Sequence, residues 1–257
     1  MRIIAIIPAR YASSRFPAKV LVDINGKTMI ERVFNQAKKA TKLSDVFIAT
    51  DNQLVFETVK KFTQNVIMTS DTHISGTDRI AEAALILEKN KVEFDFIINI
   101  QGDEPFIKPE QIDSLAEILL ENIGTQLATL VSKIKDSETL FDTNVVKAIF
   151  DVNHKAIYFS RNPIPFVRNE DRNKLDENKQ SAWLSAHTFY RHIGMYAYQK
   201  DVLQQITKLK PSTLELAESL EQLRWIENGF SIHIAITPFE SIGIDTPKDL
   251  EKIVNQK

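Results

Sequence analysis

The sequence predicts an α/β fold with a mostly parallel, Rossmann-like, doubly wound sheet. Apolar runs of strand length at residues 3–7, 45–49 and 94–100 alternate with helical periodicity at residues 29–40, 52–62 and 109–121. This alternation is typical of βαβ units, in which a helix connects two parallel strands. Because such crossovers are almost always right-handed, a doubly wound sheet is the leading architecture.

The first strand is expected at residues 3–7, where consecutive apolar residues indicate burial on both faces. It ends at Pro8, which has no N–H group for a ladder hydrogen bond. Residues 168–180 are nearly all charged or amide, so a loop is expected there. The same criteria predict strands at 66–68, 128–134, 145–150, 190–198 and 231–236, and helices at 80–88, 201–207, 213–227 and 247–254.

Composition limits the classes of function. The net charge of −2 argues against a nucleic-acid or anionic-membrane partner, and 257 residues suffice for one large core. The absence of cysteine excludes disulfides and thiolate catalysis and agrees with a reducing cytoplasm. No run approaches the roughly 20 apolar residues of a membrane span. We therefore expect a single cytoplasmic domain over residues 1–257, with no contact to membrane or nucleic acid.

A loop rich in cations follows the first strand. Arg10, Arg15 and Lys19 lie among small residues there, at the carboxyl end of a parallel strand, where open α/β sheets usually bind ligands. Arg and Lys suit phosphate oxygens, so the loop is a candidate phosphate site. A solvated basic loop is the alternative. Neither the Walker P-loop pattern nor G-x-G-x-x-G is present.

A second polar segment, QGDEP at residues 101–105, follows the apolar run at 94–100. Asp103 comes directly beyond that buried strand, in a position suited to a metal ion in the crevice of the sheet. An ordinary turn is the alternative, because Asp and Pro both favour turns.

These segments resemble the sugar-nucleotide cytidylyltransferases, and in particular the branch that acts on 3-deoxy-manno-octulosonate (Kdo). The resemblance rests on RYASSRFP at residues 10–17, SGTDR at 75–79, QGDEP at 101–105 and LEQLR at 220–224. One residue departs from the pattern, because the family commonly has Gly where this chain has Ala18. Since Gly tolerates a positive φ, Ala18 implies either an ordinary backbone or a small strain.

The resemblance implies transfer of a cytidylyl group from CTP to Kdo, which gives CMP-Kdo and pyrophosphate for lipopolysaccharide biosynthesis. It also implies a sheet of the nucleotide-diphospho-sugar transferase type, Mg²⁺ as cofactor and a homodimer. Residues 155–210 are expected to form a sugar-side and dimerisation subdomain. No covalent nucleophile is required, since such transfers depend on positioning and charge neutralisation.

The resemblance assigns roles position by position. The catalytic candidates are Arg10, Lys19, Asp103 and Asp245, and Asp103 and Asp245 are also the metal ligands. The nucleotide-binding candidates are Arg10, Ser13, Arg15, Lys19 and Arg79. The sugar-binding candidates are Gln101, Arg161, His192, Tyr196, Glu221 and Gln222.

Alternatives remain open at several of these positions. Without the resemblance, Thr77 is a candidate helix cap and His192 is better explained as a hydrogen-bonded structural histidine. Glu218 and Glu221 are then best explained as the solvated face of a helix. A cytidylyltransferase for 8-amino-Kdo or for a sialic-acid-like sugar is the nearest other enzyme. A catalytically silent nucleotide-sensing module is the alternative from another class.

Overall fold

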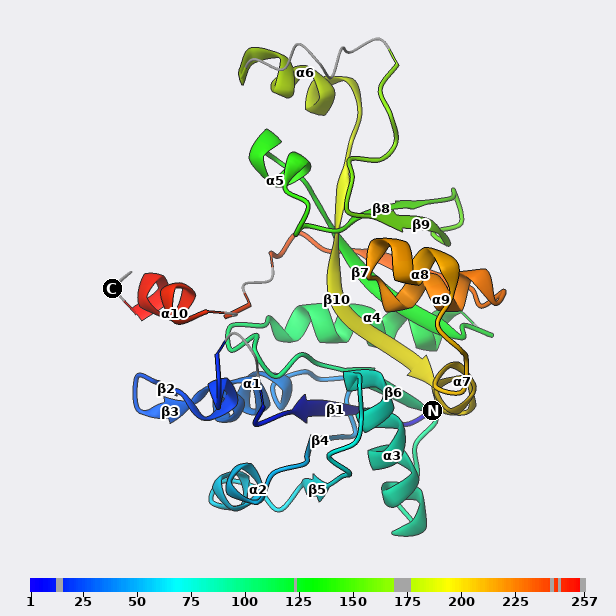
Figure 1. Cartoon of the computed structure of the whole chain (residues 1–257). Coiled ribbons are helices and arrows are strands. Elements are labelled where there is room, and N and C mark those ends of the chain that lie inside the picture. Colours follow the sequence, from blue (N-terminus) through cyan, green and yellow to red (C-terminus); the bar gives the residue numbers. More distant parts are fainter. Residues whose placement is uncertain (13–15, 123, 169–176, 241–242, 245, 255–257) are drawn as a thin grey trace. The chain divides into compact units, whose positions relative to one another are not determined.

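The computed structural model describes residues 1–12, 16–122, 124–168, 177–240, 243–244 and 246–254 (Figure 1). The chain forms two compact units. The first comprises Met1–Ile123, Met195–Lys208 and Ser241–Lys257, and the second comprises Gly124–Gly194 and Leu209–Glu240. The segment 155–210 therefore contributes to both units, and its role in dimerisation stays a prediction.

The first unit contains a mostly parallel sheet. Its strands are β1 (Ile3–Ala9), β4 (Asp45–Thr50), β5 (Val66–Met68), β6 (Phe96–Asn99) and the last part of β10 (Tyr190–Gln199). They run in the order β10, β6, β1, β4, β5, with only β10 antiparallel to its neighbour. The Ile and Ala residues of β1 are at most 1% exposed, as expected for a central strand. The predicted α/β fold is confirmed.

The first unit also contains helices. They are α1 (Met29–Ala37), α2 (Gln53–Lys60), α3 (Gly76–Lys89), α4 (Pro109–Glu121), α7 (Lys200–Ile206) and α10 (Pro247–Val254), with a short 3-10 turn η1 (Lys19–Leu21) and a small hairpin, β2 (Asp23–Ile24) and β3 (Lys27–Thr28). Helix α3 begins earlier than its periodicity predicts. Its cap is Ser75 and not Thr77, because the Ser75 hydroxyl accepts a hydrogen bond from the Asp78 N–H at 3.0 Å. None of the helices in the described ranges has the length and apolar character needed to cross a membrane.

The second unit has its own strands and core. Its strands are β7 (Leu127–Lys133), β8 (Lys147–Phe150), β9 (Ala156–Ser160), β11 (Ile232–Ile236) and the first part of β10, and its helices are α5 (Ser137–Phe141), α6 (Glu177–Ala186), α8 (Thr213–Glu218) and α9 (Glu221–Glu227). β11 pairs in parallel with β7, whereas β8 is antiparallel to both β9 and β10. Ile134, Leu140, Trp183 and Phe189 form a buried cluster in this unit.

Two sequence predictions are wrong in this second unit. Residues 177–180 were expected in a loop, but they begin α6, which the buried side chain of Trp183 anchors in the core cluster. Residues 213–227 were expected to form one helix, but Ser219 adopts a left-handed φ of 53° between α8 and α9. The carbonyl groups of Glu218 and Ser219 accept hydrogen bonds from Arg161, so they do not continue the helical ladder.

Ala18 has the positive φ that a glycine would adopt without strain. Its φ of 56° and ψ of 22° are left-handed, and its N–H donates to the Tyr11 carbonyl oxygen at 3.0 Å. A left-handed alanine costs about 1 kcal/mol, partly offset in a comparison with glycine by the greater freedom of unfolded glycine. We expect Ala18→Gly to raise the free energy of unfolding by about 0.5 kcal/mol, measured in urea. Ala217→Gly, at an exposed position of α8, is the control and should lower it by about 1 kcal/mol. Equal destabilisation by both variants would contradict the strain.

Candidate functional site

A cavity of about 460 Å³ lies at the carboxyl ends of β1 and β6, within the first unit. The loop after β1 contributes Pro8, Arg10, Ala12, Lys19 and Val20 to its lining. Residues 74–76, which lead into α3, and residues 101–103, which follow β6, complete the wall. The cavity thus joins segments that the sequence predicted separately as phosphate and metal sites.

Lys19 and Asp103 meet in this cavity. The Lys19 Nζ lies 2.6 Å from the Asp103 Oδ2, and the side chains are only 13% and 28% exposed. The predicted phosphate cation and the predicted metal carboxylate are therefore neighbours, although 84 residues separate them. Each comes from a segment that follows a parallel strand, and the carboxyl ends of such strands meet at one edge of a sheet.

Arg10 presents a buried donor at the same cavity. Its Nη2 is buried and has no hydrogen-bond partner among the described residues. A buried polar group without a partner costs about 1–3 kcal/mol, and more when it is charged. An anionic ligand in the cavity would supply the missing acceptor.

Gly102 allows the segment after β6 to approach the end of β1. A Cβ atom at Gly102 would lie 2.8 Å from the backbone oxygen of Pro8, closer than real Cβ contacts permit. Gly102→Ala must therefore shift one of the two backbone segments that line the cavity. We expect it to lower the free energy of unfolding by about 1–3 kcal/mol, the usual cost of overpacking, and to reduce turnover. Urea unfolding and initial rates measure both effects. The control is Gly194→Ala, since a Cβ there meets nothing within 4 Å; equal losses in both variants would contradict a steric cause at Gly102.

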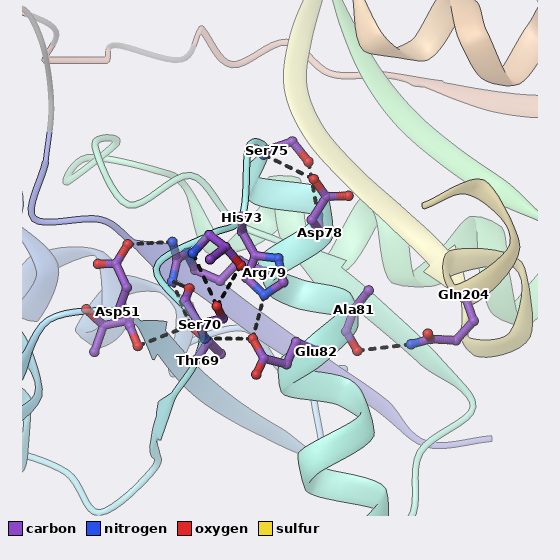
Figure 2. Close-up of polar contacts among 12 residues, drawn as sticks. Asp51, Thr69, Ser70, His73, Ser75, Asp78, Arg79, Ala81, Glu82 and Gln204 are labelled. Carbon is purple, nitrogen blue, oxygen red and sulfur yellow. Dashed lines mark hydrogen bonds and ion pairs between the residues drawn. The ribbon is translucent and has the colours of Figure 1, made fainter. Parts of the chain in front are cut away.

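Arg79 lies on α3, whose first residue, Gly76, lines the cavity, and Figure 2 shows its polar contacts. Its side chain is fully buried, with Nη2 2.6 Å from the Asp51 Oδ2 and Nη1 2.6 Å from the Thr69 Oγ1. Burial lowers the pKa of Arg79, although the Asp51 carboxylate opposes this change. Because protein groups engage this guanidinium, its contact with a nucleotide stays a prediction.

Three of the predicted residues, Ser13, Arg15 and Asp245, lie outside the described residues. Next to the last of these, Ile244 is fully buried and donates its N–H to the Asp103 carbonyl oxygen at 2.9 Å. The described segment 243–244 therefore lies beside Asp103. Of the other candidates in this unit, Gln101 lines the cavity and Tyr196 is 7% exposed on β10.

Arg161 lies in the second unit, at the end of β9. Its guanidinium donates to three backbone carbonyl oxygens, through Nε to Glu218 at 2.7 Å, Nη1 to Thr143 at 3.1 Å and Nη2 to Ser219 at 3.3 Å. The Glu218 carboxylate also accepts hydrogen bonds from the Ser160 hydroxyl at 2.6 Å and the Arg161 N–H at 3.0 Å. These contacts hold Arg161 in one place, with its guanidinium against three backbone carbonyl oxygens.

His192 lies on β10 and is half-buried. Its Nε2 is 2.9 Å from the Thr129 Oγ1, and its ring meets Phe159 edge-on. Burial lowers the pKa of His192 to about 3, so the imidazole is neutral at physiological pH. The geometry therefore favours the structural reading for its Nε2, and contact with a sugar carboxylate stays a prediction.

Because the pKa of His192 is lowered in the folded state, acid should lower the free energy of unfolding. Between about pH 6.5 and pH 3 the unfolded state binds a proton that the folded state excludes, so stability falls as pH falls. We expect this residue to contribute a slope of about 1.4 kcal/mol per pH unit in that window. Urea unfolding of the wild type and His192→Gln at pH 7, 6 and 5 measures it. The difference between the two proteins should shrink as pH falls; a constant difference would contradict a ring that stays neutral in the folded state.

Glu221 and Gln222 begin α9 in the second unit, and Gln222 is only 6% exposed. Gln222 therefore does not belong to a solvated helix face. The contact of either residue with a sugar stays a prediction.

Comparison with known proteins identifies the family of this chain. The profile of the family described as Cytidylyltransferase matches residues 4–242. The chain belongs to this family. It is 54% identical over 253 residues to the 3-deoxy-manno-octulosonate cytidylyltransferase of Cytophaga hutchinsonii. The aligned region covers 98% of this chain and 96% of that relative. The corresponding protein of Parabacteroides distasonis is 50% identical over 256 residues, with 98% and 96% covered.

Solved structures agree with this assignment. A CMP:2-keto-3-deoxy-manno-octonic acid synthetase complexed with CTP is 38% identical, with a TM-score of 0.87 over 99% of this chain and 97% of that one. A putative glucose-1-phosphate thymidylyltransferase from Bacillus anthracis, 17% identical with a TM-score of 0.63 over 97% and 93%, shares the fold alone. The resemblance predicted from the motifs is confirmed, and this cytidylyltransferase is a nucleotidyltransferase enzyme.

Sequence reasoning missed several polar residues that support the candidates. Lys147 is fully buried and donates to the carbonyl oxygens of Asp142, Val145 and Arg161 at 2.8, 2.6 and 2.6 Å. Burial lowers the pKa of Lys147 to about 8, although Asp142 opposes this. Glu218 was expected on a solvated helix face, but its carboxylate accepts hydrogen bonds from Ser160 and Arg161. A lysine on a strand, such as Lys147, gives no local signal of its partners. The partners of these residues are distant in the sequence, so periodicity does not reveal them.

The donor set at the cavity fits a magnesium ion that binds together with substrate. Within the described ranges, no group of three or more His, Cys, Asp or Glu side chains forms a metal site. Mg²⁺ usually keeps several waters and takes one or two carboxylates plus substrate phosphates. Asp103, partly exposed and next to a cation, suits that mode of binding better than a preformed cage.

Proposed function

We propose that this cytidylyltransferase transfers a cytidylyl group from CTP to Kdo and releases pyrophosphate. The observation that carries the proposal is the cavity at the ends of β1 and β6, where Lys19 pairs with Asp103 and Arg10 has a buried donor without a described partner. The names of full-length relatives with 54% and 50% identity support CTP and Kdo as the substrates.

The residues of the cavity suit a triphosphate. Arg10 and Lys19 provide positive charge, and the first N–H groups of α3 add donors where Ser75 and Gly76 line the wall. Helix N-termini favour anions because their N–H groups lack helical acceptors. Together these groups would hold the phosphates and neutralise charge on the leaving pyrophosphate.

The reaction needs no covalent enzyme intermediate. The anomeric hydroxyl of the sugar attacks the α-phosphorus, and the bond from that phosphorus to the pyrophosphate oxygen breaks. Asp103 and Asp245 would hold Mg²⁺, which supplies positive charge to the phosphate oxygens when bound. The chain itself positions the nucleotide through Arg10 and Lys19.

Further expectations belong to the same proposal. We propose Arg161, His192, Tyr196, Gln101, Glu221 and Gln222 for the sugar side, and Ser13, Arg15 and Arg79 as additional nucleotide contacts. A homodimer, a cytoplasmic location and a place in lipopolysaccharide biosynthesis stay predictions of the resemblance. Use of 8-amino-Kdo in place of Kdo is the alternative that stays open.

A substrate screen tests the proposal. CTP, UTP and ATP are each combined with Kdo, 8-amino-Kdo and N-acetylneuraminate, and pyrophosphate release is measured with Mg²⁺ and with excess EDTA. We expect release with CTP and Kdo, and its loss in EDTA. Preference for 8-amino-Kdo would change the sugar assignment, and undiminished release in EDTA would remove Mg²⁺ from the proposal. No pyrophosphate with any pair would overturn the function.

A further inference from the structure

The loop between β5 and α3, residues 69–75, forms one wall of the candidate nucleotide cavity. Ile74 and Ser75 line that cavity together with Gly76, the first residue of α3. Ile74 is 90% exposed although it is apolar. The position of this loop therefore decides where an apolar side chain and the N-terminus of α3 meet a ligand.

Arg79 fixes the start of the β5–α3 loop. Its Nη1 donates to the Thr69 Oγ1 at 2.6 Å and to the Ser70 carbonyl oxygen at 3.2 Å, and its Nη2 pairs with the Asp51 carboxylate. Figure 2 shows this guanidinium between Asp51 and the loop. The loop is thereby tied to the segment that follows β4 and to α3.

Glu82 fixes the middle of the same loop. Its Oε2 accepts a hydrogen bond from the Ser70 N–H at 2.8 Å and lies 2.5 Å from the His73 Nε2 (Figure 2). Burial alone would raise the pKa of Glu82, but hydrogen bonds from His73 and from the Ser70 N–H lower it below its ordinary value. One carboxylate oxygen thus joins residues 70 and 73, and the carboxylate stays ionised at neutral pH.

The end of the loop is fixed by the cap of α3. The Ser75 N–H donates to the Asp78 Oδ2 at 3.2 Å, and the Ser75 hydroxyl accepts from the Asp78 N–H at 3.0 Å. Ile74 therefore stands between two fixed points, His73 and Ser75, and its side chain is held outward. A wall that is ordered before the ligand arrives spares the entropy of ordering it on binding.

We propose that Glu82 is a positioning residue for the nucleotide, which holds the β5–α3 loop so that Ile74, Ser75 and Gly76 form the cavity wall. The identity of the nucleotide as CTP rests on the proposed function. Glu82 itself is absent from the lining of the cavity among the described residues, so it acts through the loop. Its loss is expected to weaken nucleotide binding and to leave the chemical step intact.

The experiment compares Glu82→Ala and Glu82→Gln with a control on the same helix. Glu88 also lies on α3, pairs with the Lys200 Nζ at 2.9 Å, and is 34% exposed against 33% for Glu82. Glu88→Ala therefore removes a similar ion pair remote from the cavity. Calorimetry measures the Kd of CTP alone, and initial rates measure kcat and the KM for each substrate.

We expect Glu82→Ala to weaken CTP binding about ten-fold, since a carboxylate that accepts two hydrogen bonds is lost. Glu82→Gln keeps an acceptor for Ser70, so it should weaken binding only about three-fold. The kcat at saturating CTP, the KM for the sugar and all constants of Glu88→Ala should stay within about two-fold. A purely structural role would lower kcat and both affinities together and would not separate the two helix positions.

Two results would overturn the proposal. One is CTP binding by Glu82→Ala equal to that of Glu88→Ala, and the other is a loss of kcat with the Kd of CTP unchanged. If Glu82→Ala does not fold, Glu82→Gln decides, and CTP binding equal to wild type, with unchanged amide exchange at Ser70, overturns the proposal. Wild-type protein that binds CTP without using Kdo would contradict the proposed function alone.

Discussion

Asp103→Asn is expected to lower kcat at least about 100-fold while the protein stays folded. The carboxylate lies 2.6 Å from the Lys19 Nζ at the cavity, and it is the described residue best placed to hold Mg²⁺. A charge interaction of about 3 kcal/mol that is lost from the transition state corresponds to a factor above 100 in rate. Asn keeps the size of the side chain, so the loop after β6 should keep its packing.

Initial rates over a range of Mg²⁺ concentrations, together with thermal unfolding, measure this effect. Lys19→Met removes the partner cation and should lower kcat about 10-fold to 100-fold, because one charged hydrogen bond is lost. Asp113→Asn is the control, since Asp113 accepts hydrogen bonds from the backbone N–H groups of Thr41 and Lys42, and none of these three residues lines the cavity. It should change stability and leave kcat unchanged. A kcat within three-fold of wild type in Asp103→Asn would mean that Asp103 is only a turn residue.

The parts of the fold that depend on local pattern were predictable. The apolar run of β1 predicts a buried parallel strand. Because ligands bind at the carboxyl ends of such strands, Lys19 and Asp103 were both expected at that edge of the sheet, where they are in contact. Both signals are local, because the apolar run of each strand and the charged residues that follow it are close together in the sequence. A ligand crevice at this edge of the sheet could therefore be predicted without knowledge of any long-range contact.

Features set by distant partners were not predictable. The break at Ser219 depends on Arg161. Its guanidinium binds the carbonyl oxygens of Glu218 and Ser219, which lie 57 and 58 residues further along the chain and which a continuous helix would use in its own hydrogen bonds. Helix α6 depends on Trp183 entering a core cluster, although the sequence around it is polar. The anchoring of Arg79 by Asp51 spans 28 residues. Such contacts appear only when the chain is folded, because propensity carries no information on them.

Arg161→Met is expected to raise the KM for the sugar about 10-fold to 100-fold and to leave the KM for CTP nearly unchanged. The contacts of its guanidinium with Glu218, Ser219 and Thr143 go to backbone carbonyl oxygens, which orient the cation but carry no net charge. An acidic sugar would supply the carboxylate that this orientation suits, and charged hydrogen bonds are worth about 1.5–3 kcal/mol each. Initial rates at saturating CTP with varied Kdo measure the change.

Structural loss has to be separated from loss of sugar binding in this variant, because Arg161 also holds the break between α8 and α9. Arg32 offers the matched control, since it too donates to two backbone carbonyl oxygens, those of Ile24 and Asn25, at 2.5 and 3.0 Å. Arg32→Met should lower stability without a change in either KM. Arg161→Lys keeps the charge but not the planar fork, so its sugar KM should fall between those of Arg161→Met and wild type. If Arg161→Met raised the KM for CTP and left that of the sugar unchanged, Arg161 would belong to the nucleotide side, and the positive charge at the end of β9 would need another ligand.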